Sequence, residues 1–203
     1  MADRPLSPGD RAPDFELPDA VAEGTLKLAE YLRRGPVLLA MLRGLYCPFC
    51  RRHISQLRPT CETLREAGIT VLGVVVGSAA RARRYFSHFP PCFPMAAAPD
   101  RAVHRAYGLV QVDRTPEFLQ ETERAAAEIL RQDAIPVPPG ESADAVFLKA
   151  DGFELTAEDE TEWHRPLQWV GYFLIGRDGQ VRWANVEARI VALPEIDELL
   201  ALV

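Results

Sequence analysis

Two cysteines at the junction of an apolar run and a helical segment are the feature that most constrains this chain. Residues 36–42 read Pro-Val-Leu-Leu-Ala-Met-Leu, a continuous apolar run typical of a buried central strand. The segment from 51 to about 68 has helical periodicity, and Cys47 and Cys50 stand between the two. This order places Cys47 at a helix N-terminus, where free backbone N–H groups and the helix dipole favour a thiolate. The pattern is typical of thiol–disulfide chemistry.

Strands and helices then alternate along the chain. Residues 69–76 form a second apolar run, and Ser78 is a candidate N-cap for a helix that reaches about residue 86. We expect a short third strand at 93–98 and a further helix at 100–107, closed by Gly108. Alternation with short links predicts a parallel sheet with right-handed crossovers.

The two ends of the chain add smaller elements. Alternating residues at 15–17 favour a short edge strand, and 28–34 a short helix. Near the C-terminus, an Asp-Gly turn separates the strand-like runs 171–175 and 181–186, which predicts a hairpin. Pro194 is a candidate first residue of a last helix.

The stretch from 111 to 168 is not needed by this strand–helix pattern. A hydroxyl cap followed by Pro116 predicts a helix, 136–140 is a Pro-rich loop, and 146–153 is a candidate small hairpin. Acidic residues gather ahead of Trp163. We interpret 111–168 as an insertion within a single domain that spans 1–203, a length that suits one well-packed domain.

Charge and composition exclude several classes of function. The chain has 203 residues and a net charge of -6, with a pI of about 5.3. This balance argues against a general nucleic-acid binder and against anchoring on an anionic membrane. No apolar run approaches the roughly 20 residues that span a bilayer, and residues 1–5 have no signal-peptide character. We therefore expect the reducing cytoplasm, where a pair of closely spaced cysteines indicates redox chemistry rather than structural disulfides.

Four ordered motifs resemble the alkyl hydroperoxide reductase and thiol-specific antioxidant family, the peroxiredoxins. They lie at 9–19, 93–108, 171–179 and 43–51, and the last is similar to the peroxiredoxin-like branch with a CxxC active site. The resemblance covers nearly all of the chain outside 111–168. It implies a thioredoxin-like α/β fold with a central mixed sheet flanked by helices and an insertion before the C-terminal hairpin.

The sequence departs from that family at three positions. Peroxiredoxins carry Thr or Ser where this chain has Gly44, Pro where it has Ala40, and Arg where it has Val170. The family's Thr and Arg bind the peroxide oxygens, so Arg43 is the candidate substitute. Thioredoxins keep a buried acid at the place of Met41, so the chain departs from that family too.

The candidate catalytic residues are the two cysteines. Cys47 is the candidate nucleophile and Cys50 the resolving thiol. Three neighbours are candidate supporting residues: Pro48 fixes the first turn of the helix, and Arg43 and Tyr46 flank the site and could stabilise a thiolate or a peroxide. We expect no cofactor and no bound metal.

The remaining histidine and cysteines leave alternatives open. Cys47, Cys50 and His53 have a spacing that zinc could use, but the chain offers no second ligand cluster. His53 could instead exchange a proton with Cys50. Cys61 lies about 16 Å along the helix from Cys50, too far for a disulfide, and is interpreted as core. Cys92 is expected at the opposite end of the sheet from Cys47, either unreactive or in an intermolecular disulfide.

The sequence thus predicts an antioxidant oxidoreductase that reduces peroxides through a Cys47–Cys50 disulfide. An external thiol of the thioredoxin or glutathione type would restore the dithiol. Thiol–disulfide exchange without peroxidase activity is the first alternative, and a non-enzymatic binding module of thioredoxin fold is the second. A homodimer is plausible from the family resemblance alone.

Overall fold

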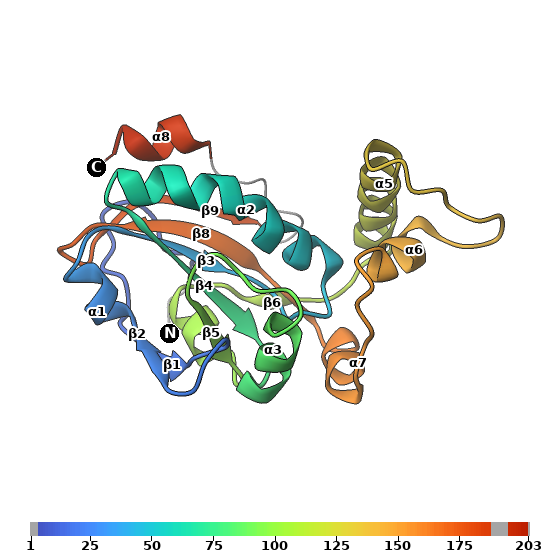
Figure 1. The fold of residues 1–203 in the computed structure, drawn as a ribbon, viewed down its shortest axis with the longest axis horizontal. Helices are drawn as coiled ribbons and strands as arrows, with labels where there is room; N and C mark the ends of the chain where they lie inside the picture. Colours follow the sequence, from blue (N-terminus) through green and yellow to red (C-terminus); the bar gives the residue numbers. More distant parts are fainter. Residues whose placement is uncertain (1–3, 188–194, 203) are drawn as a thin grey trace.

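A five-stranded mixed sheet forms the centre of the molecule (Figure 1). The computed structural model describes residues 4–187 and 195–202. Its strands are β1 (Glu16–Pro18), β2 (Thr25–Lys27), β3 (Val37–Met41), β4 (Thr70–Val76), β5 (Met95–Ala98), β6 (Gln111–Val112), β7 (Leu167–Gln168), β8 (Val170–Ile175) and β9 (Val181–Glu187). Its helices are α1 (Leu28–Leu32), α2 (Pro48–Glu66), α3 (Ala79–Phe86), α4 (Ala102–Ala106), α5 (Pro116–Gln132), α6 (Ala143–Lys149), α7 (Ala157–Trp163) and α8 (Ile196–Leu200).

The sheet has the order β5-β4-β3-β8-β9. The pairs β3–β4 and β4–β5 are parallel, as crossovers through helices require, whereas β8 runs antiparallel to both β3 and β9. This topology confirms the predicted thioredoxin-like α/β class. Strand β3 lies at the centre and is buried at every position, which explains why its sequence is continuously apolar instead of alternating.

The two faces of β3 pack into two separate hydrophobic clusters. Leu38, Ala40 and Leu42 belong to the cluster that contains the buried face of α2. Val37 and Leu39 belong to the opposite cluster, which includes residues of α1 and α4. Successive side chains of a strand point to opposite faces, so this one run of sequence supplies both halves of the core.

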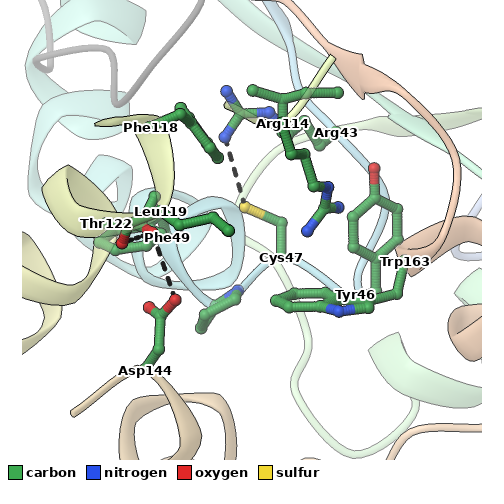
Figure 2. A pocket seen from close by; sticks show the side chains of 12 residues that line it. Arg43, Tyr46, Cys47, Phe49, Arg114, Phe118, Leu119, Thr122, Asp144 and Trp163 are labelled. Carbon is green, nitrogen blue, oxygen red and sulfur yellow. Dashed lines mark hydrogen bonds between the residues drawn. The ribbon is translucent and has the colours of Figure 1, made fainter. Parts of the chain in front are cut away.

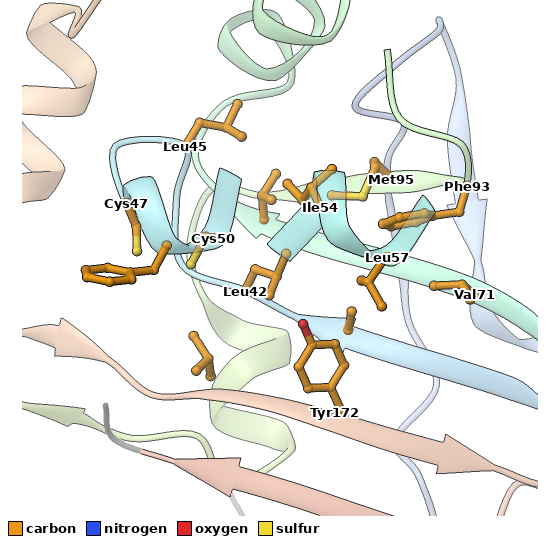
Figure 3. Packing of buried hydrophobic residues seen from close by; sticks show 14 of the residues in the cluster. Leu42, Leu45, Cys47, Cys50, Ile54, Leu57, Val71, Phe93, Met95 and Tyr172 are labelled. Atoms are coloured by element: carbon orange, nitrogen blue, oxygen red, sulfur yellow. The ribbon is translucent and has the colours of Figure 1, made fainter. Parts of the chain in front are cut away.

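Helix α2 places the two cysteines at one end of the sheet. Pro48 is its first residue, where a missing backbone N–H costs nothing. Ile54 and Leu57 are buried on the face that covers the sheet, as their spacing predicts (Figure 3). Leu64, two turns further along, is buried as well. The helix continues through Pro59 to Glu66.

Residues 111–168, here called the 111–168 segment, leave the sheet region and return to it at one point. Strand β6 at its start pairs antiparallel with β7 at its end, Gln111 opposite Gln168. Between them, α5 and α6 pack together beyond the N-terminal end of α2, and α7 lies beside α3 (Figure 1). The segment therefore stands at the end of the sheet that carries the cysteines.

The predicted hairpin at 146–153 is wrong. Residues 143–149 form helix α6, capped by the Ser142 hydroxyl, which accepts a hydrogen bond from the backbone N–H of Ala145. Phe147 packs its ring on Phe49 of α2, with ring centroids 5.0 Å apart. An Asp-Gly pair follows the helix, with Gly152 at a φ of +75°.

Smaller differences concern element ends. The strand expected at 93–98 and the helix expected at 100–107 are shorter than predicted: β5 begins at Met95 and α4 spans Ala102–Ala106. The last helix spans Ile196–Leu200, and Pro194, predicted to open it, lies outside the described residues. No helix in residues 4–187 and 195–202 is long and apolar enough to cross a membrane.

A buried ion pair fixes α7 against α3. Arg81 Nε donates to Asp159 Oδ2 at 2.7 Å, and the two side chains are only 10% and 5% exposed. The same carboxylate accepts the backbone N–H of Thr156, which closes a capping box at the start of α7. This desolvated charge pair is reinforced at the start of α3, where the Ser78 N–H and hydroxyl both donate to the Glu158 carboxylate at 2.7 Å.

Replacing Asp159 by Asn should lower the free energy of unfolding by about 3 kcal/mol, because it leaves the Arg81 guanidinium buried without its counter-charge. The amide keeps an oxygen for the Thr156 N–H, so the loss reports the charge. Urea unfolding followed by circular dichroism measures it. Glu128→Gln, which breaks an exposed pair with Arg131, is the matched control and should change stability by at most about 1 kcal/mol. Equal effects of the two substitutions would contradict the assignment.

Candidate active site

The two cysteines occupy the first turn of α2. Cys47 is the N-cap residue, with an extended backbone (φ −86°, ψ 110°), and Cys50 lies one turn further along the helix. Both are free thiols and buried, with 5% and 3% of their surfaces exposed. The sequence prediction that Cys47 stands where a helix begins is borne out by this geometry.

The surroundings shift the pKa values of the two thiols in opposite directions. A hydrogen bond from the Cys50 thiol and the charge of Arg43 hold the pKa of Cys47 well below its usual value, against the effect of burial. Burial and the adjacent Cys47 sulfur raise the pKa of Cys50 well above its usual value. These opposite shifts favour the thiolate at Cys47 and the protonated thiol at Cys50.

Arg43 is buried beside the thiolate. Its Nη1 lies 3.9 Å from Cys47 Sγ, and its Nε donates to the backbone carbonyl of Gln168 at 2.8 Å. Gln168 is itself anchored, since its side-chain amide donates to the carbonyl of Leu109 at 2.8 Å. Strand β7 at the end of the 111–168 segment thus aims this guanidinium at the sulfur.

The Tyr46 ring explains why glycine stands at position 44. A Cβ on Gly44 would lie 2.6 Å from the Tyr46 ring and 2.8 Å from the carbonyl oxygen of Val76. No Thr or Ser side chain fits there without moving the ring or the backbone. Tyr46 is 2% exposed and packs edge-on against Trp163, with ring centroids 6.2 Å apart. Burial raises its pKa, so the phenol stays protonated.

A small cavity opens over Cys47 between α2 and the 111–168 segment (Figure 2). Its volume is about 40 Å³. On the same measure one water needs about 10–15 Å³, so the space suits a molecule of a few heavy atoms. The lining residues are Arg43, Tyr46, Cys47, Pro48, Phe49, Arg114, Phe118, Leu119, Thr122, Asp144, Trp163 and Leu167.

Arg114 is the lining residue that the sequence did not reveal. Its guanidinium lies over the Trp163 ring, 4.5 Å from the centroid, and its Nε is buried without a hydrogen-bond partner among the described residues. Burial lowers its pKa, while the nearby Cys47 thiolate favours the cation. The cavity therefore has a second cation with an unused donor. No local pattern marks Arg114, because only the fold of the segment brings it to Cys47.

The candidate His53 lies outside this cavity. His53 Nδ1 is 3.4 Å from the Tyr172 hydroxyl, and burial lowers the pKa of its imidazole to about 4. Proton exchange between His53 and Cys50 stays a prediction. Trp163 lines the cavity, whereas Trp169 packs against the opposite face of the sheet. Within the described ranges no group of three His, Cys, Asp or Glu side chains could hold a metal ion.

Alkylation of Cys47 should persist to unusually low pH. The thiolate forms above the pKa, so a lowered pKa moves the midpoint of the rate profile down from the ordinary 8.5 or so toward about 5. Iodoacetamide labelling, followed by mass spectrometry of the Cys47 peptide, measures the profile. Cys50→Ala removes the hydrogen bond and should shift the midpoint upward. A midpoint near 8.5 in the unaltered chain would instead favour a non-enzymatic binding module.

Comparison of the sequence with known families gives one match over most of the sheet. Residues 8–138 match the family model described as "AhpC/TSA family". The "Putative peroxiredoxin" of Mycobacterium tuberculosis, in the strains CDC 1551 and H37Rv, is 30% identical over 103 residues. The match covers 51% of this chain and 64% of that protein, so it spans less than two thirds of the relative's length.

Solved structures share the fold at low identity. Peroxidoxin BcpB from Mycobacterium tuberculosis superposes with a TM-score of 0.60 and 16% identity, over 97% of this chain and 96% of that one. A "putative Thiol:disulfide interchange protein DsbE" from Chlorobium tepidum gives 0.57 and 19%, over 97% and 96%. The reduced 2-Cys peroxiredoxin of Plasmodium vivax gives 0.59 and 14%, over 97% and 79%. At these identities the likeness shows the thioredoxin-like fold alone.

Proposed function

Because the chain belongs to the AhpC/TSA family, we propose that it reduces hydroperoxides through Cys47 and Cys50. The observation that carries this proposal is the Cys47 thiolate at the floor of a cavity of about 40 Å³, flanked by two guanidinium groups. Hydrogen peroxide and small alkyl hydroperoxides match the size of this space, whereas a loop of a folded protein does not. Arg43 and Arg114 supply the positive charge that an O–O cleavage needs.

In the first step the Cys47 thiolate attacks the terminal oxygen of the peroxide. The S–O bond forms, the O–O bond breaks, and hydroxide or alkoxide leaves and takes up a proton. Negative charge moves from sulfur to the leaving oxygen, so cations on either side stabilise both ends of this transfer. Arg43 lies 3.9 Å from the sulfur, and Arg114 has an unused Nε donor in the same cavity wall.

In the second step Cys50 resolves the sulfenic acid. Its raised pKa keeps the thiol protonated while Cys47 reacts, so it does not compete for the peroxide. Its sulfur then attacks Cys47 Sγ, the Cys47–Cys50 bond forms, and the sulfenic oxygen leaves as water with the Cys50 proton. The first turn of α2 already holds both sulfurs together, so this step needs no unwinding of the helix.

Two equivalents of an external thiol, or one dithiol, then reduce the disulfide. The proposed donors are of the thioredoxin or glutathione type, as a reducing compartment such as the cytoplasm supplies. Cys47 is only 5% exposed, so a protein donor needs the 111–168 segment to move, whereas a small thiol needs less. A homodimer remains an expectation from the family.

Thiol–disulfide exchange is the second candidate function. The CxxC arrangement itself and the Gly44 position, which excludes the peroxide-binding Thr of the family, favour it. In this reaction Cys47 attacks a substrate disulfide and Cys50 releases the product from the mixed disulfide. The depth of Cys47 beneath the 111–168 segment argues against a folded protein as the substrate.

A single turnover with hydrogen peroxide decides between the two candidates. The reduced protein should lose two hydrogen atoms by mass spectrometry, with a change in tryptophan fluorescence since Trp163 lines the cavity. Cys47→Ser should abolish the reaction, and Cys50→Ser should stop it at a sulfenic acid that dimedone traps. A rate no faster than that of a free thiol, with fast reduction of a small disulfide, would support exchange instead.

Replacing Arg114 by Gln should lower the second-order rate constant with hydrogen peroxide by about a hundredfold, because a preorganised donor at the cleaved O–O bond is lost. Stopped-flow fluorescence under pseudo-first-order conditions measures it. Arg124→Gln, an exposed arginine on α5, is the matched control and should leave the rate unchanged. An Arg114→Gln rate equal to that of the control would remove Arg114 from the mechanism.

A further inference from the structure

Cys61 and Cys92 form a second pair of thiols. Cys61 lies on the buried face of α2, 8% exposed, and Cys92 lies in the loop between α3 and β5, where it is exposed. Burial and the neighbouring Cys92 thiol together raise the pKa of Cys61 to about 12. Two cysteines that are far apart in sequence thus meet in the fold, one accessible to solvent and one covered.

Contacts on both sides of Cys92 hold its loop along α2. Arg58, one turn before Cys61, donates from Nη2 to the carbonyl of Pro90 at 3.1 Å. Ile54 and Arg58 line a groove of about 260 Å³ together with Cys92. The next residue, Phe93, is buried in the same hydrophobic cluster as α2 (Figure 3). The loop therefore packs along α2 on both sides of Cys92, next to the helix that carries Cys61.

We propose that Cys61 and Cys92 are a second redox-active dithiol, which closes a reversible disulfide between the middle of α2 and the loop before β5. This pair acts independently of Cys47 and Cys50. Cys61 lies eleven positions after Cys50 on one helix, which is about 16 Å, so the two pairs cannot exchange disulfides directly. Cys92 is not among the residues that line the Cys47 cavity.

Because Cys92 is exposed, a soluble disulfide such as oxidised glutathione can reach its sulfur and act as the oxidant. The Cys92 thiolate attacks one glutathione sulfur, the glutathione disulfide breaks, and one glutathione leaves as the thiolate. Cys61 then gives up its proton and attacks Cys92 Sγ, and the second glutathione leaves as a thiol. The protein loses two electrons and two protons, and glutathione disulfide gains them.

The order of the two steps follows from the environments. Cys61 is buried and its pKa is raised, so it is a poor first nucleophile and a slow second one. We therefore expect a transient glutathione adduct on Cys92 ahead of the internal disulfide. Cys92 belongs to a loop, so small backbone changes there can bring the sulfurs to bonding distance while Cys61 stays on the helix.

The test uses the full chain with Cys47→Ser and Cys50→Ser, so that only Cys61 and Cys92 remain. After incubation with oxidised glutathione, intact mass should show the loss of two hydrogen atoms. Peptide mapping should link the Cys61 peptide to the Cys92 peptide, and reduced glutathione should reverse the change. Adding Cys61→Ser should stop the reaction at the Cys92 adduct, and adding Cys92→Ser should leave the chain unreacted.

A stable glutathione adduct on Cys92 in the two-cysteine chain, a disulfide between two copies, or no reaction would each overturn the proposal. Since that chain lacks Cys47, its failure is separate from a failure of peroxide reduction. If circular dichroism shows that the double substitution unfolds the protein, the unaltered chain is incubated in the same glutathione buffer and its peptides are mapped instead. The presence of the Cys61–Cys92 linked peptide then supports the pair, and its absence contradicts it.

Discussion

The hydrogen bond from Arg43 to the Gln168 carbonyl connects the cysteine-bearing end of the sheet to the 111–168 segment. Arg43 directly follows the apolar run of β3, and Gln168 ends β7, so the bond spans 125 positions of sequence. It is buried at both ends, where an unmet donor would cost about 1–3 kcal/mol or more for a charged group. The direction of the guanidinium, and with it the acidity of Cys47, depends on how the segment packs.

The position of the Tyr46 ring explains why glycine stands at position 44, close to the thiolate. The Tyr46 ring fills the space that a hydroxyl-bearing side chain at position 44 would need. That ring also packs against Trp163 of the segment, whose other neighbour is Arg114. From the segment, the guanidinium of Arg114 lines the cavity over Cys47. The Gly44 departure noted in the sequence is thus accounted for by the position of the Tyr46 ring.

The sequence predicted those features that depend on neighbours along the chain. Strands β3 and β4 and helix α2 are continuous periodic runs, and their junction places Cys47 without further information. The position of Arg114 beside Cys47 and the proximity of Cys61 and Cys92 depend instead on tertiary contacts between distant segments, which no local sequence periodicity predicts. The hairpin error at 146–153 has the same origin, because the helix there packs Phe147 against Phe49, a contact that no local pattern marks.

The 111–168 segment is joined to the rest of the fold through the two paired strands β6 and β7. Gln111 and Gln168 are direct partners, so the chain leaves and re-enters the main fold at adjacent points. A short turn joining these two strands would in principle replace everything between them without interrupting the five-stranded sheet. The hydrogen bond between Arg43 and Gln168 would survive such an excision, whereas the residues of α5, α6 and α7 that cover the Cys47 sulfur would be lost. Such an excision would also remove Phe147 and Phe153 from the cluster that packs on α2 and leave the buried Arg81 without Asp159, so the segment both covers the sulfur and completes the core.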